Sequence, residues 1–182
     1  MCICLIALAG CNKASADNYT DNAKAKAELA ERYPDAVNVK WVSKNGYSIA
    51  KFNRLATRAH NSGYDFSVWF TRSGEWCMTE SEVTYDALPL AVRTAFEASE
   101  YAGWKIDDID KVERIGMETF YVIEVETKSG NIEKEAELYY SAEGVLIKAT
   151  SGYDSDYDYE DYLPSDIQSV LESFINDRYP GA

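Results

Sequence analysis

The sequence has few of the side chains on which most enzymes depend. Of its 182 residues, one is a histidine, His60, and four are cysteines. It has no His-Glu-x-x-His, Gly-x-x-x-x-Gly-Lys, Gly-x-Ser-x-Gly or Cys-x-x-Cys motif, which excludes the common signatures of zinc hydrolases, phosphate-binding loops, serine hydrolases and redox dithiols. His60 lies in the polar stretch 54–63, where we expect a solvated loop. We therefore predict that the protein is not an enzyme and needs no cofactor.

Basic residues are also scarce. The chain has 18 Lys and Arg against 31 Asp and Glu, which gives a formal net charge of −13. A field of that sign repels the phosphates of nucleic acids and anionic lipid head groups, so nucleic-acid binding is excluded as a function class. Basic peptides, cationic protein surfaces and divalent cations remain compatible partners. The alternative, which the sequence leaves open, is that the negative charge only keeps a secreted protein soluble and does not serve to bind a partner.

Long hydrophobic runs are absent except near the N-terminus. Residues 3–8 are apolar and lead into the motif Leu8-Ala9-Gly10-Cys11. Such a run before small residues is typical of a secretory signal peptide, and the motif resembles the lipobox of bacterial lipoproteins. By that resemblance residues 1–11 are a lipoprotein signal peptide ending at the lipobox cysteine, and Cys11 is the lipidation site. We expect a cell-envelope protein that touches the membrane only through its N-terminal lipid and faces the periplasm.

Cysteine use agrees with this interpretation. Cys2 and Cys4 would leave with the signal peptide and Cys11 would carry lipid, so Cys77 is the remaining thiol. A single thiol cannot form an internal disulfide or, without other good ligands, a zinc site. We expect Cys77 to be a small buried hydrophobic side chain.

The chain repeats itself. Residues 66–76 match residues 136–146 at an offset of 70, and each segment is typical of a strand, a short turn and a second strand. Gly74 and Gly144 take the same place, where the turn is expected to need a positive φ. Helical segments that begin with Leu-Pro repeat at an offset of 75, at residues 88 and 163. A period of this size indicates repeated supersecondary units.

These patterns predict an α+β fold made of tandem repeats, each a helix packed on a four-stranded antiparallel sheet, with a C-terminal third helix. The expected helices cover 22–33, 89–101 and 164–179, and the expected strands 37–43, 47–53, 64–71, 75–84, 110–117, 119–128, 133–141 and 145–150. The predicted boundaries are a tether at 12–21, a first unit at 22–87, a second unit at 88–152, and an acidic linker with the C-terminal helix, an incomplete third unit, at 153–182.

A family resemblance supports the same organisation. Helices that open with Leu-Pro, that close near Tyr33-Pro34-Asp35-Ala36 or Tyr179-Pro180-Gly181-Ala182, and that are followed by hairpins with a glycine turn resemble the PepSY-like, beta-lactamase-inhibitor-like periplasmic proteins. The resemblance covers most of residues 24–182. It implies proteins that act as inhibitors or interaction modules rather than as catalysts. Inhibition of a beta-lactamase in particular does not follow from a shared fold.

Aromatic residues are abundant, with 14 tyrosines and four tryptophans, and such residues often anchor protein interfaces. Alternation along the strand turns Trp69 away from the helix, and the repeat puts Tyr139 in the equivalent place. If that sheet face is exposed, the two aromatics, ringed by Glu124, Glu126 and Glu137, would bind a protein or peptide partner in the cell envelope. The alternative is that Trp69 and Tyr139 pack between the units as a core.

The acidic segment 154–161 offers a second hypothesis for function. Asp154, Asp156 and Asp158 match the first ligand positions of an EF-hand loop, and hard oxygen ligands suit calcium. Tyr159 stands where the loop needs glycine, and Ser165 stands where it needs a bidentate glutamate. The protein could thus be a calcium- or small-ligand-binding structural envelope protein. The segment could equally be a solvated linker whose acidic residues favour the start of the next helix.

Overall fold

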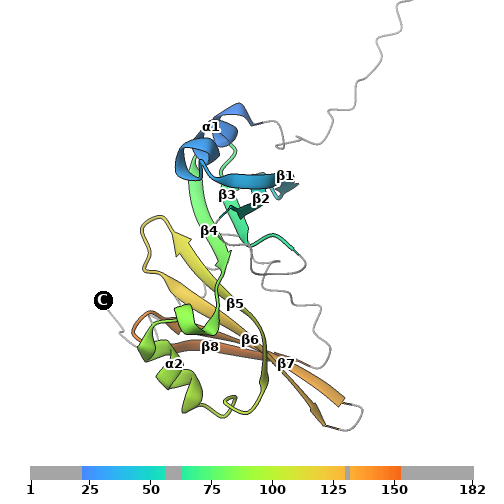
Figure 1. Cartoon of the computed structure of the whole chain (residues 1–182), viewed down its shortest axis with the longest axis vertical. Helices are drawn as coiled ribbons and strands as arrows, with labels where there is room; N and C mark the ends of the chain where they lie inside the picture. Colours follow the sequence, from blue (N-terminus) through green and yellow to red (C-terminus); the bar gives the residue numbers. More distant parts are fainter. Residues whose placement is uncertain (1–21, 56–62, 130–131, 153–182) are drawn as a thin grey trace, which may run out of the picture.

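The computed structural model describes residues 22–55, 63–129 and 132–152 (Figure 1). Within these ranges eight antiparallel strands form one sheet in the order β1 to β8. The elements are α1 (Ala23–Arg32), β1 (Ala36–Lys44), β2 (Tyr47–Arg54), β3 (Phe66–Phe70), β4 (Trp76–Glu82), the 3-10 helix η2 (Tyr85–Ala87), α2 (Leu90–Glu97), β5 (Lys105–Arg114), β6 (Phe120–Ser129), β7 (Ile132–Ser141) and β8 (Leu146–Gly152). Neither helix in this part of the chain has the length and apolar character of a membrane span.

The predicted tandem of separate four-stranded sheets is wrong, because the two sets of strands join into a single sheet. β4 and β5 pair in register from Met78 and Arg114 to Glu82 and Asp110. β4 runs from the part of the sheet near α1 to the part near α2 and links them (Figure 1). Pairing removes two edges whose backbone groups would otherwise lack partners. The described residues hold two α-helices, and the third helix predicted at 164–179 lies outside them.

Both helices lie on the same face of the sheet. α1 buries Ala25 and Leu29 in one hydrophobic cluster with side chains of β2 and β3. α2 buries Val92 and Phe96 in a second cluster with side chains of β5, β6 and β7. The register of β4 on β5 puts these two sets of strand residues on one side of the pleat. We call the opposite side the helix-free face.

The second helix is shorter than the predicted range 89–101, and β5 begins earlier than predicted. The Ser99 hydroxyl donates to the carbonyl of Phe96 and accepts from the amide of Tyr101, at 2.7 and 3.1 Å. A serine side chain that satisfies backbone groups in this way competes with continued helix. The chain therefore turns after Glu97 and reaches the sheet at Lys105.

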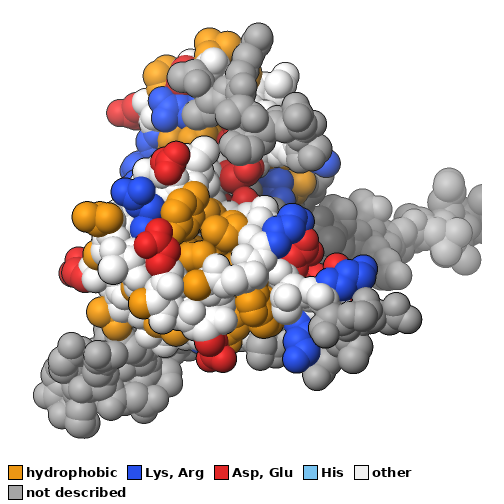
Figure 2. Space-filling model, turned by 60° about the horizontal axis from the view of Figure 1, so that its bottom comes forward, with side chains coloured by type: hydrophobic (Ala, Val, Ile, Leu, Met, Phe, Trp, Pro, Cys, Tyr) orange, Lys and Arg blue, Asp and Glu red, His pale blue; other side chains and the backbone are white. Residues whose placement is uncertain are grey.

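The described surface mixes hydrophobic side chains with charges of both signs on the side seen in Figure 2. Large hydrophobic residues that are well exposed are scattered along the chain. The most exposed are Leu90 at 71%, Ile115 at 65% and Leu55 at 60%. Single exposed residues of this kind are normal for a globular protein and do not by themselves mark a binding site.

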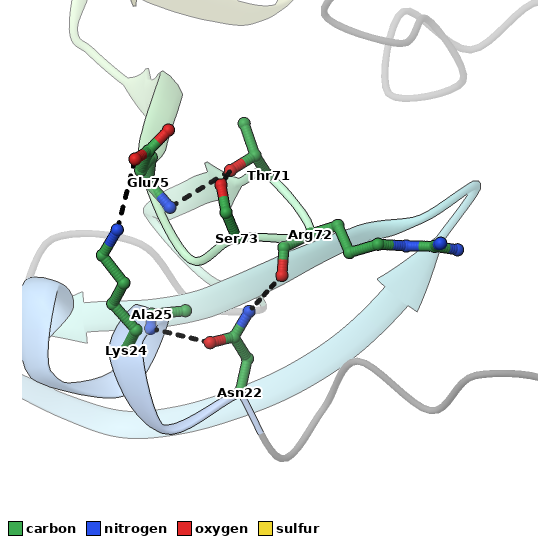
Figure 3. Close-up of polar contacts among 7 residues, drawn as sticks. All are labelled: Asn22, Lys24, Ala25, Thr71, Arg72, Ser73 and Glu75. Atoms are coloured by element: carbon green, nitrogen blue, oxygen red, sulfur yellow. Dashed lines mark hydrogen bonds and ion pairs between the residues drawn. The ribbon is translucent and has the colours of Figure 1, made fainter.

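The turn between β3 and β4 packs against the start of α1 (Figure 3). The side chain of Asn22 accepts a hydrogen bond from the Ala25 amide at 3.1 Å and donates one to the Arg72 carbonyl at 3.2 Å. Lys24 pairs with Glu75 at 3.2 Å. Asn22 thus caps the helix and holds the turn at the same time.

The glycines of the two matching turns adopt the backbone conformation predicted for them. Gly74 has φ +82° and Gly144 has φ +80°, so the prediction of a positive φ is confirmed. Each glycine also lies close to the first turn of a helix. A Cβ atom on Gly74 would lie 2.9 Å from the Ala25 nitrogen, and one on Gly144 would lie 2.4 Å from the Ala91 carbonyl oxygen. The hairpin turn and the helix start are therefore in contact in both halves.

Candidate partner-binding face

The helix-free face carries a hydrophobic cluster that runs across both halves of the sheet. Its buried members come from β2 to β7 and are each at most 8% exposed. They are Ile49, Trp69, Cys77, Met78, Val112, Phe120, Val122 and Tyr139. We call this set the apolar cluster. It contains no residue of α1 or α2, so it is a core separate from those that the helices cover.

Trp69 and Tyr139 both belong to the apolar cluster, with exposed fractions of 2% and 4%. The Trp69 ring meets Tyr47 edge to face at a centroid distance of 5.9 Å. The Tyr139 ring stacks on Phe120 at 6.4 Å. Of the two alternatives left by the sequence, the structure has the aromatics packed as a core between the halves. Neither ring is presented to solvent.

Each of these aromatics donates a hydrogen bond to a buried carboxylate. Trp69 Nε1 lies 3.1 Å from Glu80 Oε2, and the Tyr139 hydroxyl lies 2.8 Å from Glu137 Oε2. Thr150 donates a further bond to the same oxygen of Glu137 at 3.0 Å. Glu80 is 5% and Glu137 is 9% exposed. Since a buried carboxylate is costly without donors, the aromatics hold both acidic groups at the edge of the apolar cluster.

Acidic side chains occupy neighbouring positions on four strands of the helix-free face. Four cross-strand pairs each join two of them: Glu82 with Asp110, Asp108 with Glu124, Glu124 with Glu137, and Glu126 with Glu135. We call these seven residues the acidic band. Strands are about 4.8 Å apart, so Glu124 has a carboxylate on the strand to either side. Like charges directly opposite each other on a sheet are destabilising.

Some positive charge lies at the edge of the acidic band. Lys105 forms ion pairs with Glu126 and with Asp107. The hydrogen bond with Glu126 is the main reason that the pKa of Lys105 is raised above its usual value. Lys148 lies over the Tyr139 ring, with its ammonium 5.5 Å from the centroid. Glu124 has an acidic residue opposite it on each neighbouring strand, Asp108 on β5 and Glu137 on β7.

The structure places all five predicted partner-binding residues on this one face. Glu124, Glu126 and Glu137 lie in the acidic band, and Trp69 and Tyr139 lie in the apolar cluster. Sequence reasoning missed Glu80, which the Trp69 side chain contacts, and the acidic residues of β4 and β5. Their spacing at every second position of a strand was the available signal. This spacing could not identify an acidic face from the sequence, because the register of β4 on β5 is needed to show that the acidic residues of the two strands lie side by side.

Cys77 is part of the apolar cluster and is 8% exposed. Its Sγ donates to the carbonyl of Trp69 at 3.2 Å. Burial raises the pKa of the thiol to about 12. A thiol that stays protonated is a poor nucleophile, so Cys77 has a packing role and offers no catalytic group.

The other predicted site residues fall outside the part of the chain that the structure describes. These are the lipidation residue Cys11 and the calcium candidates Asp154, Asp156 and Asp158. His60 also lies outside it. Within residues 22–55, 63–129 and 132–152, no three His, Cys, Asp or Glu side chains are grouped so that they could hold a metal ion.

Solved structures from Bacteroides species resemble this fold. A DUF2874 family protein from Bacteroides ovatus is 30% identical, with a TM-score of 0.64 over 79% of this chain and 94% of that chain. A DUF2874 family protein from Bacteroides uniformis is 28% identical, with a TM-score of 0.60 over 71% and 88%. A BLIP-like protein from Bacteroides fragilis is 30% identical, with a TM-score of 0.58 over 75% and 92%. A comparison with curated proteins finds no match.

Sequence comparison gives the same grouping. The model of the beta-lactamase-inhibitor-like, PepSY-like family matches residues 58–148, which run from before β3 into β8. The matched range contains both buried carboxylates and the whole of the acidic band. The chain therefore belongs to the beta-lactamase-inhibitor-like, PepSY-like family.

Proposed function

We propose that this protein is a non-catalytic binding module of the bacterial cell envelope, which captures a basic segment of a protein or peptide on its acidic band. The observation that carries the proposal is the set of four like-charge cross-strand pairs on β4 to β7. The BLIP-like name of one structural neighbour supports a binding role. Beta-lactamase is not proposed as the partner, because a shared fold is a weak argument for a shared target.

The four like-charge cross-strand pairs of the acidic band favour a cationic partner for electrostatic reasons. A like-charge pair on a sheet costs a few tenths of a kcal/mol, up to about 1 kcal/mol, and Lys105 offsets part of this cost at Glu126. Lysine or arginine side chains placed over the band would remove that repulsion and add attraction. The net charge of −13 would also speed the approach of a basic segment by electrostatic steering. The same charge disfavours acidic partners.

In this proposal Trp69 and Tyr139 act from beneath the surface. Their side chains hold Glu80 and Glu137 through the hydrogen bonds of 3.1 and 2.8 Å. A carboxylate held in one position loses less conformational freedom when a cation binds to it. Tyr139 is thus a positioning residue for Glu137 of the acidic band, and Trp69 holds Glu80 next to Glu82 of the band.

The proposal includes attachment to the membrane through a lipid on Cys11, with residues 12–21 as a tether. It is supported by the lipobox-like motif Leu8-Ala9-Gly10-Cys11. Cys11→Ala should move the full chain from the membrane fraction to the soluble fraction of the envelope. A variant that stays in the membrane fraction would refute the lipid anchor and leave the binding proposal untouched.

The binding test uses a ten-residue peptide in which lysine alternates with threonine, so that an extended peptide presents all lysines on one side. Glu124→Gln/Glu135→Gln removes two charges from the acidic band. The control Glu113→Gln/Glu143→Gln removes the same net charge from the opposite face and from the turn before Gly144. Peptide affinity is measured by calorimetry at low and at physiological salt.

We expect the acidic-band variant to bind the lysine peptide about fivefold more weakly, because two ion pairs are worth about 1 kcal/mol. The control should change the affinity by less than about twofold. Equal losses in both variants would show that the peptide responds only to net charge, and would overturn the proposal. The same peptide with glutamate in place of lysine should not bind.

A further inference from the structure

Positive charge gathers on the first two strands of the sheet. β1 and β2 contain no Asp or Glu, and they carry the three lysines Lys40, Lys44 and Lys51. We call these three residues the lysine group. Lys40 lies directly opposite Lys51 in the register of the two strands. Like charges in such a pair repel each other, so the lysine group repeats the arrangement of the acidic band with the opposite sign.

The lysine group lies on the helix-free face. Val42 and Ile49 are opposite each other on β1 and β2, and both pack in or against the apolar cluster. Alternation along β1 puts Lys40 and Lys44 on the same side as Val42. Alternation along β2 puts Lys51 on the same side as Ile49. The helix-free face therefore has a basic end on β1 and β2 and an acidic end on β4 to β7.

We propose that the partner of the acidic band also carries an acidic segment, and that this segment binds the lysine group on the same face. The inference rests on the proposed function, because it concerns the partner whose basic segment the acidic band binds. Complementary charge at both ends would give that partner one direction across the sheet. A segment that is basic throughout would meet repulsion at the lysine group.

The distance between the two ends sets the spacing that the partner needs. Lys40 and Lys51 lie in a cross-strand row that reaches Val112 on β5. Asp108, four residues before Val112, pairs with Glu124 on β6. Lys40 and Glu124 are thus five strands and four residues apart, a separation of about 28 Å along the sheet. About eight residues of an extended chain cover that length.

Local charge decides which segment of the partner goes to which end. The net charge of −13 disfavours an acidic partner as a whole. At physiological ionic strength, however, screening reduces the effect of a charge within about 8 Å, much less than the separation of the two ends. Lys40 is also exposed. A carboxylate beside Lys40 and Lys51 is therefore attracted by these lysines and is little affected by the acidic band.

The test is a double-mutant cycle between the lysine group of the full chain and a synthetic peptide. The peptide has three lysines alternating with threonine at one end and two glutamates at the other. Its middle lysine and first glutamate are eight residues apart. A second peptide has glutamine in place of both glutamates. Both peptides are titrated by calorimetry at physiological salt.

The protein variants remove two positive charges from one face or from the other. Lys40→Gln/Lys51→Gln removes them from the lysine group. The matched control Lys24→Gln/Lys26→Gln removes them from α1, which packs on the opposite face. The two variants have the same net charge, so a difference between them reports the place of the charges.

We expect the unmodified chain to bind the glutamate peptide about fivefold more tightly than the glutamine peptide, the effect of two exposed ion pairs. The difference should vanish in Lys40→Gln/Lys51→Gln and persist in the control. Equal affinities of the unmodified chain for the two peptides would overturn the inference and leave the proposed function in place. If neither peptide binds, the proposed function fails and the inference fails with it.

A second copy of this chain is the competing occupant, because it carries both charge groups. Sedimentation of the unmodified chain and of both variants measures this directly, and we expect a monomer in each case. A dimer that is lost in Lys40→Gln/Lys51→Gln and kept in the control would assign the lysine group to a contact between copies. That result would overturn the inference of a separate partner.

Discussion

Replacing Gly144 by alanine should destabilise the protein for two reasons that can be separated. Gly144 has φ +80°, a backbone conformation that is strained for any residue with a Cβ atom. The new Cβ would also lie 2.4 Å from the carbonyl oxygen and 2.6 Å from the carbonyl carbon of Ala91. Both atoms belong to the backbone of α2, so relief requires the helix or the turn to move.

The backbone strain contributes about 1–2 kcal/mol, and the overpacking about 1–3 kcal/mol. Gly144→Ala should therefore lower the free energy of unfolding by about 2–5 kcal/mol. Gly116→Ala is the matched control. Gly116 has φ +73°, and its added Cβ would meet nothing within 4 Å. In the control the free energy of unfolding should fall only by the cost of the backbone strain, about 1–2 kcal/mol.

Urea unfolding with linear extrapolation measures both variants. The difference between them isolates the contact of the turn with α2. If Gly144→Ala is no less stable than Gly116→Ala, the close packing of the turn on the helix start is refuted. Gly74→Ala gives an independent check, since its Cβ would lie 2.7 Å from the Lys24 Cβ and 2.9 Å from the Ala25 nitrogen.

Three further predictions concern the helix-free face. Trp69→Phe keeps a ring but removes the donor to Glu80, and should lower the free energy of unfolding by about 1–3 kcal/mol; an unchanged urea midpoint would contradict this. Glu124→Gln should raise it by about 0.2–1 kcal/mol at low salt and by less at high salt, and a loss of stability would show that the repulsion is already compensated. Because the pKa of Cys77 is raised from 9.0 to about 12, the folded state holds this proton more tightly than the unfolded state. The contribution of this proton to the free energy of unfolding is fully present below pH 9 and is lost as the pH rises toward 12. Cys77→Ala should make the fall in that window shallower, and an equally steep fall would assign it to other groups.

Local features of the fold followed from the sequence. The hairpin formed by β6 and β7, Phe120–Ser129 and Ile132–Ser141, lies within one residue of the predicted strands 119–128 and 133–141 at every end. The turns at Gly74 and Gly144 have the predicted backbone conformation. These features depend on the alternation of apolar and polar residues and on the position of glycine in a turn. Both are local signals that can be recognised within a few residues of sequence.

The merging of the two halves could not be predicted in the same way. The pairing of Met78 with Arg114 joins positions with η2 and α2 between them, so no short pattern encodes it. The shortened second helix also moved β5 toward the N-terminus, which hid the alternation of its acidic residues. Alternation does show that Trp69 faces away from the helix. It does not show whether that side of the sheet is wet or dry, because burial depends on what lies opposite.

The joined sheet also determines how the molecule can be divided. A cut between β4 and β5 would separate these paired strands and split the apolar cluster between the two fragments. Each fragment would expose a strand edge and part of a hydrophobic core, so each would tend to recapture the other or a second copy of itself. The eight-stranded sheet is thus a single unit in thermodynamic terms. We expect the whole sheet to unfold in one cooperative transition. Each half should be insoluble when it is produced alone and soluble when the two halves are produced together.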